Sequence, residues 1–159
     1  NNDKLANAIA ESINADFVQL KEKRKRTYLT ILLDVIFNRT PKIQEPKKTF
    51  EQYEYIIFIA PIWFGKIALL LRTLFEYLKK TNKKYSFISL SSGADGVNPN
   101  LEKELIQRTG IKPQTVINQL IKEMLHVNPK PSRKEINTYK ISEDEANEVV
   151  KEIITKLNL

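Results

Sequence analysis

The sequence predicts an α/β fold in which a parallel sheet is covered by helices on both faces. Segments rich in β-branched and aromatic residues alternate along the chain with segments whose apolar residues recur at helical spacing. The strand-like segments are apolar on both faces, which is typical of a sheet buried between two layers. The length of 159 residues suits one domain, and we expect residues 1–159 to form it.

The first third of the chain contains two predicted helices and one short strand. Residues 3–13 place Leu5 and Ile9 on one stripe, and Asn2 is positioned to cap the helix start. A short strand is expected at Asp16–Leu20. Apolar residues then recur at helical spacing from Leu29 to Phe37.

The middle of the chain carries the two clearest strands. Tyr55–Ala60 and Tyr85–Leu90 are apolar on both faces, as expected for central strands of a parallel sheet. Between them, residues 67–78 present a broad apolar helical face. A helix over Asn100–Thr109 is expected to end at Gly110.

The last third is predicted to hold one more strand and a long helix. Thr115–Ile121 is the strand, and the proline-rich residues 126–140 are interpreted as a surface connection. Ser142 and Glu145 have the spacing of a capping box. An amphipathic helix follows to Leu157.

Composition excludes several classes of chemistry. The chain has no Cys, so disulfides, thiol nucleophiles and iron–sulfur clusters are excluded. It has one His, His126, around which no metal-ligand cluster can be built, and no G-x-S-x-G motif of a hydrolase. No membrane span or signal peptide is recognised, so a cytoplasmic protein is expected.

The net charge of +7 leaves open an anionic partner. The basic run Lys21–Arg26 could meet a nucleic acid or the phosphate of NADPH, but a solvated turn is the simpler explanation. No nucleic-acid-binding motif accompanies the run, and we expect no nucleic acid partner.

Three of the four glycines follow the two central strands. Gly65 comes after the first, and Gly93 and Gly96 come after the second. Ligands of open α/β sheets bind beyond the carboxyl ends of the strands, so these glycines mark a candidate site. Tight turns alone would also explain them. The first loop carries Trp63 and Phe64, which can stack on a flat ring or cover the core.

These loops resemble those of the flavodoxin-like family. Residues 55–77, YIIFIAPIWFGKIALLLRTLFEY, are similar to its third strand, ring-contacting loop and following helix. Residues 85–98, YSFISLSSGADGVN, resemble its fourth strand and second ring-contacting loop. The opening NNDKLA matches the end of the family's phosphate loop, with Asn2 in place of its last Thr.

The resemblance implies a three-layer sandwich with a parallel sheet of order 2-1-3-4-5 and FMN at the strand ends. Asn1 and Asn2 would then belong to the phosphate site, where a helix start favours a dianion. The first ring-contacting loop would comprise Pro61, Ile62, Trp63, Phe64, Gly65 and Lys66. The second would comprise Ser91, Ser92, Gly93, Ala94, Asp95, Gly96 and Asn98. Asp95 would accept from the ring N3–H, or simply cap its loop.

The sequence departs from the family at three points. The first strand and most of the phosphate loop are missing ahead of Asn1, so we expect the chain to be part of a longer protein. The loop over residues 91–98 has no aromatic residue to stack on the flavin, and the chain is basic where carrier flavodoxins are acidic.

The resemblance therefore implies an FMN-binding redox protein that passes electrons from NAD(P)H to a quinone or another small acceptor. The flavin would carry the chemistry, so no catalytic side chain is assigned. Two alternatives stay open. One is a non-enzymatic electron-transfer flavodoxin with a redox partner protein, and the other is a flavodoxin-fold binding module without a cofactor. A homodimer is compatible with each.

Overall fold

A computed structural model describes residues 1–21, 43, 47–63, 65–93, 97–125 and 131–158. The described elements, in chain order, are α1 (Asn2–Ser12), η1 (Lys47–Phe50), β1 (Tyr55–Ile59), β2 (Ile62–Trp63), β3 (Lys66–Ile67), η2 (Leu69–Leu71), α3 (Arg72–Thr81), β4 (Lys84–Ser91), α4 (Leu101–Thr109), β5 (Val116–Leu120), α5 (Ile121–Met124), α6 (Arg133–Thr138) and α7 (Glu143–Leu157). Within these residues, no helix is long and apolar enough to cross a membrane.

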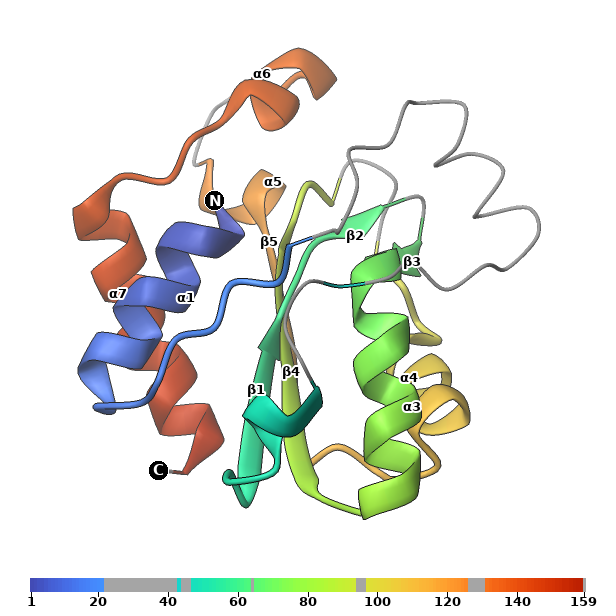
Figure 1. Ribbon diagram of the computed structural model, residues 1–159. Coiled ribbons are helices and arrows are strands. Elements are labelled where there is room, and N and C mark those ends of the chain that lie inside the picture. Colours follow the sequence, from blue (N-terminus) through green and yellow to red (C-terminus); the bar gives the residue numbers. More distant parts are fainter. Residues whose placement is uncertain (22–42, 44–46, 64, 94–96, 126–130, 159) are drawn as a thin grey trace.

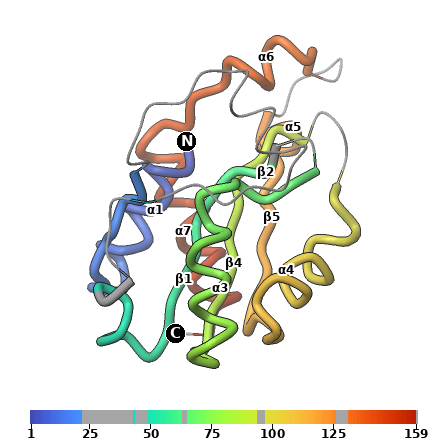
Figure 2. Tube along the Cα trace, turned by 45° about the vertical axis from the view of Figure 1, so that its right-hand side comes forward, coloured from blue at the N-terminus to red at the C-terminus, as the bar shows by residue number. Residues whose placement is uncertain are grey.

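The fold has three layers, a parallel sheet between two layers of helices (Figure 1). The described strands of this sheet lie in the order β1-β4-β5, and both pairs are parallel. Helices α1 and α7 cover one face, and α3 and α4 cover the other (Figures 1 and 2). The predicted α/β class is thereby confirmed, as are the strands predicted at 55–60, 85–90 and 115–121.

Two apolar clusters hold the layers together, one on each face of the sheet. On the α3 face, Phe58 contacts Phe75 and Tyr85 edge-on, with ring centroids 5.5 and 5.9 Å apart. On the α1 face, Ile88 packs in one cluster with residues of α1 and α7. Every residue of β4 except Lys84 is buried, as expected for an interior strand.

The helix ends follow the sequence signals. The Ser142 side chain accepts from the backbone N–H of Glu145, whose carboxylate accepts from the backbone of Ser142, so the predicted capping box is formed. Gly110 ends α4 with φ 72°, a conformation that costs glycine little. The proline-rich connection contains a helix that the sequence prediction missed, α6, which starts with a second capping box at Ser132.

Three local predictions were wrong. Asp16–Leu20 forms no strand, because no strand of the described residues lies beside it to accept its hydrogen bonds. Asn2 makes no cap hydrogen bond, because α1 already begins at Asn2 and Asn1 occupies the cap position. The helix expected from Ile67 begins later, since Ile67 belongs to a hairpin strand. Residues 29–37 lie outside the described part of the chain, as do all but the first residue of the basic run.

Candidate functional site at the carboxyl edge of the sheet

The candidate site lies where the parallel strands end. β1 and β4 run in the same direction, so the segments that follow them emerge at the same edge of the sheet. The start of α1 and the short helix α5 lie at this edge as well (Figures 1 and 2). The topology thus brings together the three segments that the sequence singled out.

The first loop is a small hairpin. Ile62 pairs with Ile67 and Trp63 with Lys66, so β2 and β3 are antiparallel. Gly65 has φ +69°, and a Cβ placed there would meet no atom within 4 Å. The left-handed backbone favours glycine, and the open space leaves this peptide accessible to a ligand.

The second loop is packed more tightly. The Ser91 hydroxyl donates to Asn118 Oδ1 at 2.8 Å, and the Lys122 N–H donates to the Ser92 carbonyl at 3.3 Å. Gly93 is buried with φ +69°, and a Cβ there would lie 3.0 Å from the Lys122 side chain. A packing role therefore accounts for Gly93, whereas Gly65 faces open space.

Asn98 joins the two loops. Its Nδ2 donates to the Gly65 carbonyl at 2.8 Å, and its Oδ1 accepts from the Asn100 N–H at 2.9 Å. The two loops therefore lie in contact at this edge of the sheet. The Asn98 amide fixes the orientation of the Gly65 peptide.

Asn1 and Asn2 lie at the start of α1, but their side chains are engaged with the protein. Asn2 Nδ2 donates to the Leu90 carbonyl at 2.9 Å, and its Oδ1 accepts from the Leu90 N–H at 2.9 Å. Asn1 Nδ2 donates to the Tyr139 carbonyl, and its Oδ1 accepts from the Ile141 N–H. The groups at this helix start that suit an anion are its backbone N–H groups, since the first α-helical bond is Leu5 N–H to the Asn1 carbonyl.

A polar groove of about 690 Å³ opens beside the first loop. It is lined by Gly65, Lys66, Asn98, Asn100, Lys103, Glu104, Gln107 and Arg108. Arg108 is paired with Glu104 at 2.6 Å, while the Lys66 and Lys103 side chains are exposed. No sequence motif marks the α4 residues of this groove, although they recur at four-residue spacing along the helix.

Four predicted site residues, Phe64, Ala94, Asp95 and Gly96, lie outside the described residues. Of the described ones, Pro61 accepts from the Ala68 N–H at 3.3 Å, which closes the base of the hairpin. Within the described residues, no group of His, Asp and Glu side chains is arranged to hold a metal ion.

Comparison with known proteins supports the fold. No family model matches the chain, and no curated protein sequence matches it. Among solved structures, the chain is similar to a protein from Bacteroides eggerthii DSM 20697 described as a putative flavoprotein. The TM-score is 0.64 at 13% identity, and the alignment covers 99% of this chain and 91% of that one. This likeness supports the flavodoxin-like fold that the sequence resemblance implied.

Proposed function

We propose that the protein binds FMN at the carboxyl edge of its sheet and works as a redox protein. The observation that carries the proposal is the pairing of two loops from neighbouring parallel strands through the bond from Asn98 Nδ2 to the Gly65 carbonyl. A neighbour of the same fold described as a putative flavoprotein adds support.

The residues present fit such a group. The open side of Gly65 leaves room for a ring edge against its backbone. The hairpin Pro61–Lys66 and the loop that begins at Ser91 would flank the ring, and Asn98 would keep the Gly65 peptide in one orientation. The N–H groups in the first turn of α1 would receive the phosphate. Asp3 in that same turn competes for the positive end of the helix, so the phosphate contribution is smaller than at an uncharged helix start.

Bound FMN would supply reversible acceptance of electrons as hydride or singly. This chain's residues would bind and orient the ring and leave one side of it open. The groove beside Gly65 presents Lys66 and Lys103, whose charges suit the phosphates of NAD(P)H. We therefore favour an oxidoreductase that passes electrons from NAD(P)H to a quinone or another small acceptor.

The proposal is tested by titrating FMN with purified full-length protein while flavin fluorescence is followed. We expect quenching that saturates. Asn98→Ala should weaken FMN binding by about tenfold, since one oriented peptide group is worth about 1 kcal/mol or slightly more. Asn137→Ala, at an exposed position of α6, is the matched control and should bind FMN as the wild type does.

Three outcomes separate the candidate functions. NAD(P)H oxidation with quinone turnover supports the oxidoreductase. Flavin that is reduced only by a partner reductase supports the electron carrier. If FMN keeps the fluorescence of free flavin, both redox functions are refuted and a binding module without cofactor remains.

A further inference from the structure

Lys122 brings a positive charge to the candidate flavin site from a third strand end. β5 ends at Leu120 and runs parallel to β4, so the short helix α5 emerges at the same edge of the sheet as the second loop. Ser91 of β4 pairs with Leu120, which places Lys122 two residues beyond this pair and beside the loop that begins at Ser91. The Lys122 N–H donates to the Ser92 carbonyl at 3.3 Å and ties α5 to that loop.

The Lys122 side chain lies across the backbone of Gly93. A Cβ added to Gly93 would lie 3.0 Å from both Cγ and Cδ of Lys122, so the aliphatic part of this side chain packs against the glycine. The ammonium is two bonds beyond Cδ and therefore stays within a side chain's length of the second loop. Lys122 is half-buried, and within the part of the chain that the structure describes no carboxylate pairs with its ammonium. The packing thus holds a positive charge beside the loop.

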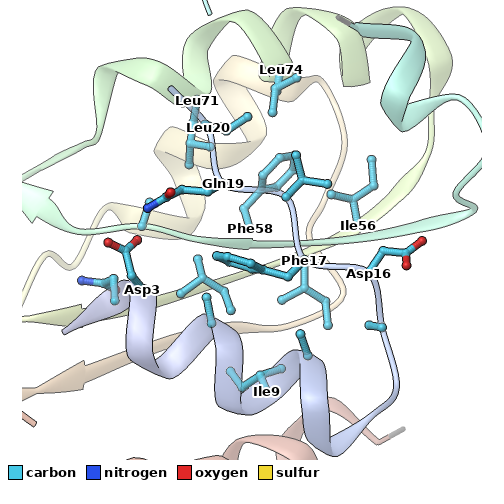
Figure 3. A pocket seen from close by; sticks show the side chains of 18 of the residues that line it. Asp3, Ile9, Asp16, Phe17, Gln19, Leu20, Ile56, Phe58, Leu71 and Leu74 are labelled. Carbon is cyan, nitrogen blue, oxygen red and sulfur yellow. The ribbon is translucent and has the colours of Figure 1, made fainter. Parts of the chain in front are cut away.

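Other charged side chains near the site are more exposed or carry the opposite charge. Lys66 and Lys103 of the groove are exposed, so water and salt screen their charges. An apolar pocket of about 600 Å³ beside β1 reaches the start of α1. The charged residues among its lining are the carboxylates Asp3 and Asp16, which lie at opposite ends of it (Figure 3). Lys122 is therefore a less screened source of positive charge than either lysine of the groove.

A cation at this place would act on the charge that a flavin gains on reduction. A hydride carries two electrons and one proton, so its transfer from NAD(P)H leaves the reduced ring with one negative charge more than the oxidised ring, as long as no second proton is taken up. A nearby cation stabilises the added charge by Coulomb attraction. We propose that Lys122 supplies this cation, holds reduced FMN more tightly than oxidised FMN, and so raises the reduction potential of the flavin. This inference rests on the FMN site of the proposed function.

The test measures the affinity of the protein for FMN in both oxidation states, under anaerobic conditions. Lys122→Gln removes the charge but keeps Cγ and Cδ, and with them the contact to Gly93. This variant should bind reduced FMN about tenfold more weakly than the wild type does, and oxidised FMN within about twofold of it. A tenfold change in the ratio of the two affinities lowers the two-electron reduction potential of the bound flavin by about 30 mV, which a titration against reference dyes measures independently.

Controls separate the charge of Lys122 from its packing and from the net charge of the protein. Lys122→Arg retains the positive charge and should keep the wild-type ratio of the two affinities. Lys151→Gln removes one charge from an exposed position of α7 and should also leave the ratio unchanged. The thermal unfolding midpoint without FMN should be the same in Lys122→Gln and in the wild type, because the contact to Gly93 is retained.

The outcomes distinguish a failure of this inference from a failure of the proposed function. If FMN binds and Lys122→Gln weakens both oxidation states equally, or neither of them, the inference is overturned while the flavin site stands. An equal change of the affinity ratio in Lys151→Gln would assign the effect to the net charge of the protein and would overturn the inference as well. If the wild type leaves the fluorescence of free flavin unchanged, the proposed function fails and the inference fails with it.

Discussion

Replacing Asn2 should destabilise the protein by an amount that follows from the geometry of β4. β1 ends at Ile59, and beyond Ala60 the chain turns into the hairpin, so β1 does not pair with Leu90. Both amide atoms of Asn2 bond to the Leu90 backbone at 2.9 Å, in place of the missing peptide group. The Asn2 side chain therefore completes the strand edge at the point where β1 leaves it.

Asn2→Ala should remove both hydrogen bonds. Leu90 is 2% exposed, so its N–H and carbonyl are left without partners in a nearly dry environment. Each buried unsatisfied group costs about 1–3 kcal/mol. Because Asn2 is half-buried, we expect the Leu90 N–H and carbonyl together to cost about 2–4 kcal/mol, in the lower part of the range for two groups. In urea, with a slope of about 2 kcal/mol per molar, the unfolding midpoint should fall by about 1–2 M.

The assay is urea unfolding followed by circular dichroism, with the slope unchanged between wild type and variant. Asn7→Ala on the same helix is the control, because Asn7 is exposed, and its free energy of unfolding should change by less than about 0.5 kcal/mol. Amide exchange at Leu90 should accelerate in Asn2→Ala alone. A loss below about 0.5 kcal/mol in Asn2→Ala would refute the role assigned to this amide.

Three further predictions concern two glycines, a helix cap and the pH dependence of stability. Gly93→Ala should destabilise by about 2–4 kcal/mol, because a left-handed residue is strained and its Cβ would lie 3.0 Å from Lys122. Gly65→Ala, with the same φ but open space, should cost about 1–2 kcal/mol, and equal losses in thermal unfolding would contradict the packing role of Gly93. Ser142→Ala should cost about 1 kcal/mol by loss of the α7 cap. Hydrogen bonds from Ser142 hold the pKa of Glu145 below its ordinary 4.5 in the folded state. The resulting stabilisation is present above pH 4.5 and is lost as pH falls through the folded-state pKa, so Glu145→Gln should flatten the stability profile in that acidic range, and an unchanged profile would contradict it.

The strands that could be predicted are those whose pattern is set by the layers around them. Tyr55–Ile59 and residues 85–90 are apolar on both faces, which only a doubly covered sheet explains. Asp16–Leu20 has a strand-like composition but no strand beside it, and pairing is a property of the partner as much as of the segment. The local pattern therefore predicts where a strand can form, and the sheet determines whether it does.

Among the helices, too, the sequence predicted one capped helix and missed another. The capping box at Ser142 was recognised because a long amphipathic pattern follows it. Ser132 and Glu135 form the same motif ahead of only six helical residues, with Ile136 as the single buried one. The apolar repeat there is too short to distinguish a helix from the surrounding proline-rich sequence.

For the site, the sequence predicted which loops meet but not how their side chains are used. The strand-end rule brings Gly65 and Asn98 to one edge of the sheet. The bond between Asn98 and Gly65 joins residues 33 positions apart, and the bonds of Asn2 to Leu90 join residues 88 positions apart. Contacts at such separations depend on the finished tertiary structure, and no local spacing indicates them.

FMN titration of the full-length protein, followed by amide chemical shifts together with flavin fluorescence, tests the central claim most directly. The account predicts saturable quenching, with shifts concentrated at Gly65, Asn98 and the first turn of α1 and none at the carboxyl end of α7. Fluorescence that stays that of free flavin, or shifts that gather away from the carboxyl edge of the sheet, would contradict the proposed flavin site.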